Sequence, residues 1–300
     1  MLAIDISSEF LHLLELKTHR KGWEISAYAT EPLPKGVINL QRLVDAAQFS
    51  QALQRALKQL SLRPLWGRRK VIMALPVNQT IMKTVAIVPD LPQHALMEHL
   101  QQTVDSQTAA HTTEVLWDYA NLTHPDQNLV TEVILTIAQQ ATVQAYQQVF
   151  AENHLALQVV DIENYALTRA AMACSLANAQ DKTYGILLLR KELITLVVVT
   201  AKQHMYARTA PLEPAENYAA SMVQTIGQLV KSVNFSHDFV EVTELLLAGE
   251  YAEDSLADLI SQKLHLPVSL VTPPPRVQGC MAAEVFPHYF LSLGLALWSK

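Results

Sequence analysis

A carboxylate followed by two hydroxyl groups stands near the end of the first apolar segment of this sequence. Asp5 lies in a predicted strand over residues 2–6, and Ser7 and Ser8 come directly after that strand. A carboxylate in this position can orient a hydrated metal ion, and the backbone N–H groups of a tight loop can bind a phosphate. The structural alternative is an acid that closes the loop through a local hydrogen bond. The residues themselves leave both roles open.

Two further groups of reactive side chains are better explained by structure than by chemistry. His94, Glu98 and His99 fall on one predicted helix, but the order His-x-x-x-Glu-His is not a zinc-protease pattern, which favours a solvated helix face. Cys174 lies in an alanine-rich helical segment and is interpreted as a small buried apolar residue. The second cysteine, Cys280, is distant in sequence, so a disulfide framework and a cysteine zinc site are both excluded.

One short segment gathers positive charge around an aromatic residue. It contains Arg63, Trp66, Arg68, Arg69 and Lys70. The simple interpretation is a solvated loop before a strand, and the alternative is contact with anionic lipid headgroups. The whole chain carries a formal charge of −6, so we do not expect a nucleic-acid partner.

The composition indicates a folded protein with little glycine. Half of the 300 residues are apolar and 17% are charged, which excludes general disorder. There are eight glycines, where an average usage of roughly 7% would give about 21, so glycine-rich phosphate-binding loops are not expected. The longest apolar stretches are shorter than the roughly 20 residues of a membrane-spanning helix. Because the N-terminus also lacks a basic leader, we expect a cytoplasmic protein.

The hydrophobic pattern predicts two halves with the same order of elements. In the first half we expect strands at 2–6, 11–16 and 23–29, a helix over 40–60 and a strand at 70–75, and later a strand at 156–160 and a helix from 162 to about 177. In the second half we expect strands at 184–189, 193–200 and 204–210, a long helix after Pro214, a strand at 245–248, a helix at 255–264 and a strand at 267–271. Each half therefore begins βββα and continues with alternating strand and helix.

This order predicts an α/β protein of the actin-like fold, in which two ribonuclease-H-like domains face a cleft. The first domain is placed at 1–178, with an inserted βαββα subdomain at about 79–157, and the polar segment 178–181 is the boundary. The second domain is placed at 179–300, with a small helical upper part at about 213–241 and a C-terminal helix at 287–298. The run Pro273-Pro274-Pro275 is expected to be a connecting spacer, and a docking motif is the alternative.

Several segments resemble the PilM family, actin-like cytoplasmic proteins of type IV pilus assembly. They are the opening LAIDISSEFLHLLEL, the loop Leu33-Pro34-Lys35-Gly36, the segment LLLAGEYAEDSLADLISQKLHLPVSLVTP and the ending FLSLGLALWSK, which contains Gly294. The insertion resembles the extra subdomain that this family shares with the cell-division protein FtsA. The order of elements agrees with the family over nearly the whole chain.

The resemblance also shows where this sequence departs from nucleotide-binding relatives. In the first phosphate loop, Asp5 and Ser8 remain, but Ser7 stands at the glycine position and His12 at the lysine position. In the adenosine loop Gly249 remains, followed by the larger residues Glu250 and Tyr251. These five positions, Asp5, Ser7, Ser8, His12 and Gly249, are interpreted as vestiges of nucleotide loops.

The second phosphate loop departs further. Leu188 aligns near its expected acid and Arg190 near its expected glycine. Because an apolar side chain cannot hold a metal-bound water, we expect a pseudo-ATPase with no catalytic residue, no metal and no cofactor.

The function implied by the resemblance is a non-catalytic scaffold at the inner face of the inner membrane. Its partner would be the cytoplasmic N-terminal tail of a PilN-type inner-membrane protein, which it would link to the pilus assembly ATPase in twitching motility or competence. An extended tail needs apolar pockets and backbone hydrogen bonds rather than glycine loops. The candidate groove lies between the first subdomain and the insertion, with Leu33, Pro34, Val37, Val85 and Ile87 as candidate contacts.

Two alternatives remain at this stage. One is an active ATPase or phosphotransferase that uses ATP and Mg²⁺ with unusual loops. The other is a GspL-like cytoplasmic scaffold of type II secretion. GspL proteins carry a transmembrane helix after the cytoplasmic domain, and this sequence ends at Lys300 without one, which favours the pilus interpretation.

Overall fold

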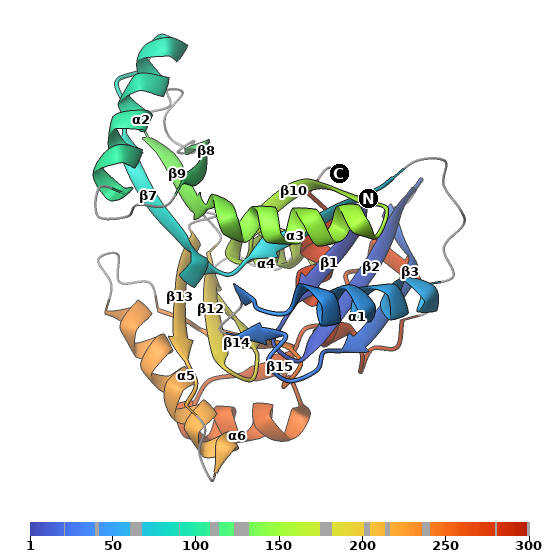
Figure 1. Ribbon diagram of the computed structural model, residues 1–300. Helices are drawn as coiled ribbons and strands as arrows, with labels where there is room; N and C mark the ends of the chain where they lie inside the picture. The colour runs from blue at the N-terminus through green and yellow to red at the C-terminus, as the bar shows by residue number, and fades with distance from the viewer. Residues whose placement is uncertain are drawn as a thin grey trace. The chain divides into compact units, whose positions relative to one another are not determined.

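The computed structural model describes residues 1–20, 22–39, 42–60, 68–89, 91–108, 114–122, 132–174, 182–200, 205–213, 217–235, 241–279 and 281–298. The chain forms two compact units (Figure 1). Unit 1 comprises Met1–Leu75 and Val149–Lys300, and unit 2 comprises Pro76–Gln148. The predicted boundary segment 178–181 lies outside the described residues.

Unit 1 contains two sheets that share the same order of five strands, and the first sheet has a sixth strand at one edge. The first has the order β10-β6-β1-β2-β3-β16, built from β1 (Leu2–Ile6), β2 (Phe10–His19), β3 (Gly22–Pro32), β6 (Arg69–Leu75), β10 (Leu155–Ile162) and β16 (Val277–Gly279). The second has the order β13-β12-β11-β14-β15, built from β11 (Tyr184–Leu189), β12 (Leu193–Val199), β13 (Met205–Pro211), β14 (Glu244–Gly249) and β15 (Val268–Leu270). In each sheet three antiparallel strands are followed by two strands that add in parallel. The predicted repeat of element order is confirmed.

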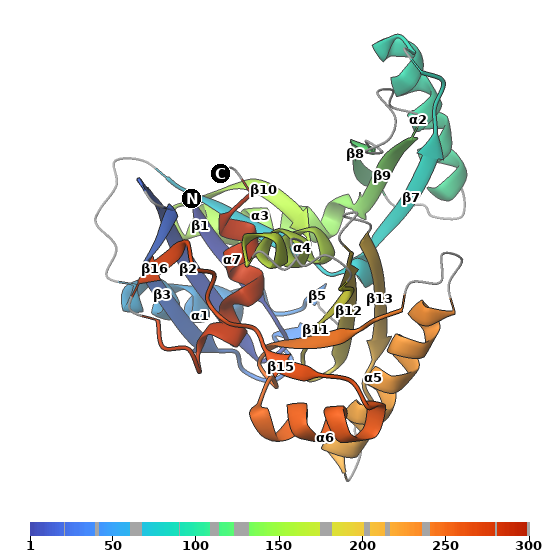
Figure 2. The same ribbon diagram turned by 180° about the vertical axis from the view of Figure 1, so that it is seen from behind.

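Helices cover both faces of these sheets. On the outer faces lie α1 (Ala46–Gln59) against the first sheet, and α5 (Tyr218–Asn234) and α6 (Asp254–Leu264) against the second. Between the two sheets lie α4 (Glu163–Ala173), a 3₁₀ turn (Phe286–Tyr289) and α7 (Phe290–Ala296), as Figure 2 shows. The two sheets therefore share one core around α4 and α7.

The sequence of β11 is apolar throughout rather than alternating, because side chains on both faces of the strand are buried. Successive side chains of a strand point to opposite faces. Ile186 and Leu188 enter the core shared with α4 and α7, whereas Leu187 and Leu189 enter the outer core under α5 and α6. All four are 2% exposed or less, so both faces of this strand are covered.

The close packing of α4 on α7 depends on a glycine. A Cβ built on Gly294 would lie 1.8 Å from the carbonyl oxygen of Ala166, so no larger residue fits between these helices. Arg169 donates from Nε to the Gly294 carbonyl oxygen at 3.0 Å. Gly294 therefore serves the packing of these two helices.

The C-terminal segment corrects the predicted domain boundary. The sequence pattern predicted that 179–300 forms the second domain, but β16 pairs with β3, and α7 packs on β1, β2 and α4 of the first. The run Pro273–Pro275 lies on the connection that brings the chain back, as the spacer interpretation expected. The predicted helix 287–298 is divided into the 3₁₀ turn and the shorter α7.

The predicted helix over 40–60 begins later than expected. A small hairpin of β4 (Ile38–Asn39) and β5 (Arg42–Leu43) occupies its first part, and Leu40 lies outside the described residues. Asp45 is the N-cap of α1, and its Oδ1 accepts a hydrogen bond from the Gln48 backbone N–H at 2.9 Å. The apolar spacing before Asp45 belongs to the hairpin and its loop.

Unit 2 has the predicted βαββα order. It contains a 3₁₀ turn (Val77–Gln79), β7 (Thr80–Ala86), α2 (Gln93–Thr108), β8 (Val115–Leu122), β9 (Glu132–Gln139) and the start of α3 (Gln140–Glu152). The antiparallel sheet has the order β7-β9-β8 and forms its own core with α2.

The insertion ends within α3, not near residue 157 as predicted. Phe150 packs against Phe49 of α1 at 6.4 Å between ring centroids, and Asn153 donates from Nδ2 to Ser50 Oγ at 2.8 Å. Strand β10 pairs with β6, so it belongs to the first sheet. In the described part of the chain, no helix is long and apolar enough to cross a membrane.

Candidate functional site

The loop between β1 and β2 is closed by the hydroxyl group of Ser7. Its Oγ accepts hydrogen bonds from the backbone N–H groups of Glu9 at 3.2 Å and Phe10 at 3.0 Å. The Ser7 backbone N–H donates to the Phe10 carbonyl oxygen at 3.0 Å. The loop amides that would have to bind a phosphate are thus bonded within the loop, and Ser7 and the adjacent Ser8 are both buried.

A buried guanidinium joins this loop region to the second sheet. Arg190 follows β11 and is 3% exposed. Its Nη2 lies 2.5 Å from Asp5 Oδ1, and its Nη1 lies 2.8 Å from Oε1 of Glu163, the first residue of α4. Thr195 on β12 donates to the other Glu163 oxygen, Oε2, at 3.2 Å. One arginine therefore bridges β1 of the first sheet and the start of α4.

Burial and ion pairing oppose each other in this triad. Burial raises the pKa of the Asp5 and Glu163 carboxyl groups, and the Arg190 guanidinium opposes that rise. Burial disfavours the charged guanidinium as well, but the two carboxylates outweigh it and raise the pKa of Arg190. A buried group of this kind is stable only when each charge has a partner of opposite sign, because burying a lone charge costs free energy.

His12, which stands at the family's lysine position, is a packed core residue. It is 1% exposed, and its Nδ1 lies 3.0 Å from Thr30 Oγ1. Its ring meets the Tyr289 ring edge to face at 5.2 Å between centroids. Its Nε2 lies 3.5 Å from Oε1 of Glu250, which follows β14. This places an acidic side chain from the end of the second sheet's β14 beside the Asp5 region.

Gly249 is required by packing of backbone on backbone. Its φ is +96°, in the region that favours glycine, and an added Cβ would lie 2.5 Å from the Leu189 carbonyl oxygen. The interpretation of Gly249 as a nucleotide-loop vestige therefore gains a structural alternative, namely the close contact of β14 with the end of β11.

Side chains from all three loops meet around Glu9. Lys191 of the second loop forms an ion pair with Glu9 Oε1. Tyr251 of the third loop donates from its hydroxyl to Glu9 Oε2 at 2.6 Å. Tyr218 of α5 donates from its hydroxyl to the Lys191 carbonyl oxygen at 2.5 Å, and its ring lies 5.5 Å from that of Tyr251. The loops that end β1, β11 and β14 are thus fastened to one another.

These contacts decide how well a Mg²⁺–nucleotide fits the three loops. Asp5 and Glu163 both face Arg190, the Ser7 hydroxyl occupies the loop amides, and Tyr251 fills space beside Glu9. Among the described residues, no group of three His, Cys, Asp or Glu side chains is placed to hold a metal ion. In this arrangement the residues do not fit the cofactor.

The predicted partner contacts fall into two groups. Leu33, Val37 and Val85 are 8%, 0% and 6% exposed, and Val85 belongs to the unit 2 core. These side chains support their own units and are corrected from direct contacts to core residues. Pro34 is exposed and Ile87 is half-buried, so these two stay candidate contacts.

The other sequence candidates take structural positions. His94, Glu98 and His99 are exposed on α2, as a solvated face requires. Cys174 is the C-cap of α4 and is half-buried rather than fully buried as predicted, and burial raises the pKa of its thiol to about 12. Cys280 lies outside the described residues.

Part of the basic cluster is also accounted for. Arg69 forms an ion pair with Glu15 of β2, which binds it into the first sheet. Arg68 and Lys70 are exposed. Arg63 and Trp66 lie outside the described residues, so the lipid contact stays a prediction.

Sequence reasoning missed the partners of Arg190. It placed Arg190 near a lost glycine, but it did not connect that side chain with Asp5 and Glu163. A signal was present for Arg190, because it is a charged residue directly after an apolar strand whose faces are both covered. The sequence does not show that Asp5 and Arg190, which are 185 positions apart, form a direct contact.

Comparisons with known proteins agree with this fold. The family model described as type IV pilus assembly protein PilM matches residues 3–215. A solved PilM-PilN type IV pilus biogenesis complex covers 99% of this chain and 97% of its own chain, at 20% identity and a TM-score of 0.80.

More distant structures share the fold alone. The cytoplasmic domain of EpsL, an inner-membrane component of the type II secretion system of Vibrio cholerae, covers 100% of this chain and 95% of its own, at 11% identity and a TM-score of 0.51. MreB 5 of Spiroplasma citri bound to AMPPNP covers 100% and 95%, at 8% identity and a TM-score of 0.51. The two matching sheets of unit 1 form the actin-like fold that the sequence predicted. Because the family model matches well over half of its length, this chain belongs to the PilM family of type IV pilus assembly proteins.

Proposed function

We propose that this protein is a non-catalytic scaffold of the type IV pilus assembly platform. It binds the cytoplasmic N-terminal tail of a PilN-type protein at the inner face of the inner membrane, and it does not bind or hydrolyse ATP. The observation that carries this proposal is the Arg190 guanidinium between Asp5 and Glu163, at 2.5 and 2.8 Å.

Arg190 supports the proposal because it removes the groups that ATP chemistry needs. Hydrolysis requires a carboxylate free to orient Mg²⁺ and donors free to stabilise the developing phosphate charge. Here both carboxylates are ion-paired, and the loop amides of Glu9 and Phe10 are bonded to Ser7. Opening this site for a nucleotide would leave buried charges unpaired, which costs several kcal/mol.

In a scaffold, the contacts of these loops would hold the two sheets of unit 1 in a fixed arrangement. Arg190, Lys191 and Tyr251 fasten the second sheet to the β1–β2 loop of the first. Ion pairs and hydrogen bonds that are satisfied internally hold such a joint in one arrangement without a ligand. A preformed surface loses less entropy when a flexible tail binds.

The proposed tail contacts are the 33–37 loop in unit 1 and, as a separate candidate in unit 2, the end of β7. Leu33 and Val37 fix this loop from below, and Pro34 is presented at the surface. Ile87, just after β7, is half-buried against the core of unit 2. An edge strand such as β7 also leaves backbone groups available for an extended tail.

The experiment is a calorimetric titration of the full chain with a synthetic tail peptide from the PilN-type protein of the same organism. We expect saturable binding that Pro34→Glu and Ile87→Glu each weaken at least about tenfold, since a buried charge opposes an apolar contact. Met172→Glu, at a 40% exposed apolar residue of α4, is the matched control and leaves the affinity unchanged. If the wild-type chain does not bind the tail, the scaffold proposal fails.

The link to the assembly ATPase is part of the same proposal. The solved PilM-PilN complex supports a PilN-type partner, and the family description supports the pilus system over the type II secretion alternative. Roles in twitching motility or competence follow from the proposal and are tested by deletion of the gene, with loss of pili as the expected result.

A further inference from the structure

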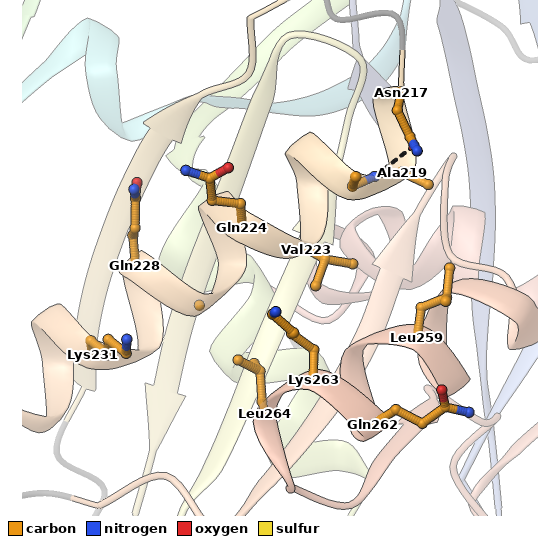
Figure 3. Close-up of a pocket in the computed structure, with 12 residues that line it drawn as sticks. Asn217, Ala219, Val223, Gln224, Gln228, Lys231, Leu259, Gln262, Lys263 and Leu264 are labelled. Atoms are coloured by element: carbon orange, nitrogen blue, oxygen red, sulfur yellow. Dashed lines mark hydrogen bonds between the residues drawn. The ribbon is translucent and has the colours of Figure 1, made fainter.

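A long groove runs between α5 and α6 on the outer side of the second sheet (Figure 3). Its volume is about 990 Å³. The groove is lined by Asn217, Ala219, Ala220, Val223, Gln224, Gly227, Gln228 and Lys231 of α5 and its N-cap, and by Leu259, Gln262, Lys263 and Leu264 of α6. None of these residues takes part in the three-loop network, so the groove is a separate feature.

The floor of the groove is apolar and its residues are small. Ala220, Val223 and Gly227 follow one another at helical spacing on α5. The two helices lie close together at Gly227, where an added Cβ would lie 3.2 Å from Leu264 Cδ2, the end of a flexible side chain. Leu259 lies on the α6 side of the groove and is 48% exposed. An apolar floor of this kind accepts side chains from a partner.

The charged residues of the groove are both positive. Lys231 and Lys263 lie on opposite walls, and the other polar lining residues are amides. The acids of α6, Asp254 and Asp258, are not among the lining residues. The chain as a whole carries a formal charge of −6, so this groove has the opposite sign to the molecule.

An exposed aromatic residue lies at the C-terminal end of α5, beyond the residues that line the groove. Phe235 caps α5 and is 87% exposed. It follows Lys231 by four residues, so it lies on the same helical stripe one turn farther on. A single exposed aromatic residue is common on protein surfaces, so Phe235 adds apolar area near the groove but does not define it.

We propose that this groove binds an amphipathic helix with acidic flanks from a partner protein, at a site distinct from the tail site. From Asn217 to Lys231 the α5 wall spans about 21 Å at a rise of roughly 1.5 Å per residue, which matches a partner helix of about 14 residues. Apolar side chains of that helix pack on Val223, Leu259 and Leu264, and its carboxylates meet the two lysines. Two packed helices form a groove that accepts the ridge of a third helix.

The test uses the full chain and two designed helical peptides of about four turns each. Both carry leucines along one stripe, and the flanks are glutamate in one peptide and lysine in the other. We expect the full chain to bind the glutamate peptide at least tenfold more tightly than the lysine peptide, measured by fluorescence anisotropy, and the difference to shrink as salt screens the charges.

Variants locate the contact. The double variant Lys231→Glu/Lys263→Glu is expected to lose at least tenfold in affinity for the glutamate peptide and to gain affinity for the lysine peptide. Lys58→Glu, at an exposed lysine near the end of α1, is the matched control and changes neither affinity. Because all three lysines point to solvent or to the groove, the variants are expected to fold, which circular dichroism checks.

Three outcomes overturn the proposal. Equal affinity for the two peptides would show that the charges of the groove do not select the partner. An unchanged affinity in the double variant would show that the peptide binds elsewhere. A wild-type dimer in sedimentation that the double variant converts to a monomer would assign the groove to a second copy of this chain. None of these outcomes bears on the PilN-type tail, whose titration is separate.

Discussion

Arg190 holds two buried carboxylates in place, and its loss would leave both without their counter-charge. Asp5 and Glu163 are 5% and 1% exposed, so water cannot replace the guanidinium. Breaking a buried pair by removing one partner costs more than replacing the whole group with apolar residues. The site therefore stabilises the folded protein only while all three charged side chains are present.

We predict that Arg190→Ala lowers the free energy of unfolding by about 3–5 kcal/mol. Chemical denaturation followed by circular dichroism measures it. The control is Lys182→Ala, which removes an exposed ion pair with Glu244 and is expected to have a smaller effect. A triple variant, Arg190→Met with Asp5→Asn and Glu163→Gln, is expected to be more stable than Arg190→Ala. Equal stabilities would show that the buried charges do not control the effect.

Gly249 and Gly36 form a matched pair of glycines with positive φ. Gly249 lies against the Leu189 backbone, whereas a Cβ on Gly36 would meet nothing within 4 Å, at φ values of +96° and +89°. Both alanine variants carry backbone strain, of about 1–3 kcal/mol. We predict that Gly249→Ala costs more than Gly36→Ala, because it adds a steric clash. Thermal denaturation of the two variants checks this, and equal losses would reject the role of backbone packing.

His288 gives the site a pH dependence. Burial, and then the neighbouring His12, lower the pKa of His288, while Glu250 and Glu253 oppose this shift. A lowered histidine pKa means that the folded state favours the neutral ring. The stabilisation is complete above the ordinary value near 6.5 and is lost as the pH falls through that value toward the folded pKa.

We therefore predict that the difference in melting temperature between wild type and His288→Gln changes between neutral and acidic pH, with wild type losing more on acidification. Melting curves of both proteins across this range test the prediction. Asp5 and Glu163 titrate in the same way in both proteins, so they cancel in the difference. A difference in melting temperature that stays constant with pH would show that His288 does not contribute to the pH dependence of stability.

At the scale of elements, α4 and α7 determine how the two sheets are joined. Both helices lie in the core that the sheets share, and they touch at Gly294 and Ala166. The chain reaches this position only after β16 has returned to the first sheet. The C-terminal segment therefore completes the first half, although it follows the second half in sequence.

We predict that Gly294→Ala destabilises the protein by at least about 1–3 kcal/mol, the usual cost of overpacking, because the helices must move apart. Gly227→Ala is the control in another helix. Its Cβ would meet only a flexible leucine side chain at 3.2 Å, and alanine favours the helix by about 1 kcal/mol. Unfolding in urea compares the two. A Gly294→Ala protein as stable as wild type would contradict the close packing.

The sequence predicted elements well where their hydrophobic pattern was unbroken, as in β1, β11 and the βαββα insertion. It failed where two patterns overlapped. The apolar positions before Asp45 continued the spacing of α1 but belong to a hairpin, and the polar cap was the stronger signal. It also failed where the fold crosses between halves, because β16 is three residues long and no local pattern shows that it pairs with β3.

The site was predicted as a set of positions but not as a set of contacts. Asp5, Ser7, His12 and Gly249 do meet near the ends of β1, β11 and β14. What they contact depends on tertiary packing, since Arg190 reaches Asp5 from the other sheet. A lost glycine is visible in a sequence, whereas the ion pair that takes its place is visible only in the fold.

At the scale of the whole molecule, the three loops and the shared core hold the two sheets of unit 1 in one arrangement. Proteins of this fold that use nucleotides need loops that release and rebind phosphate. Here the loops are bound to one another through Arg190, Lys191 and Tyr251. We therefore propose that unit 1 is a fixed body that offers surfaces to partners.

Calorimetric titration of the purified full chain with MgATP tests this account most directly. We predict no saturable heat, and no change in the affinity for the PilN-type tail when MgATP is present. Micromolar binding of MgATP that is lost in a folded Asp5→Ala variant would contradict the account, because it would show that Asp5 is available to a nucleotide rather than committed to Arg190.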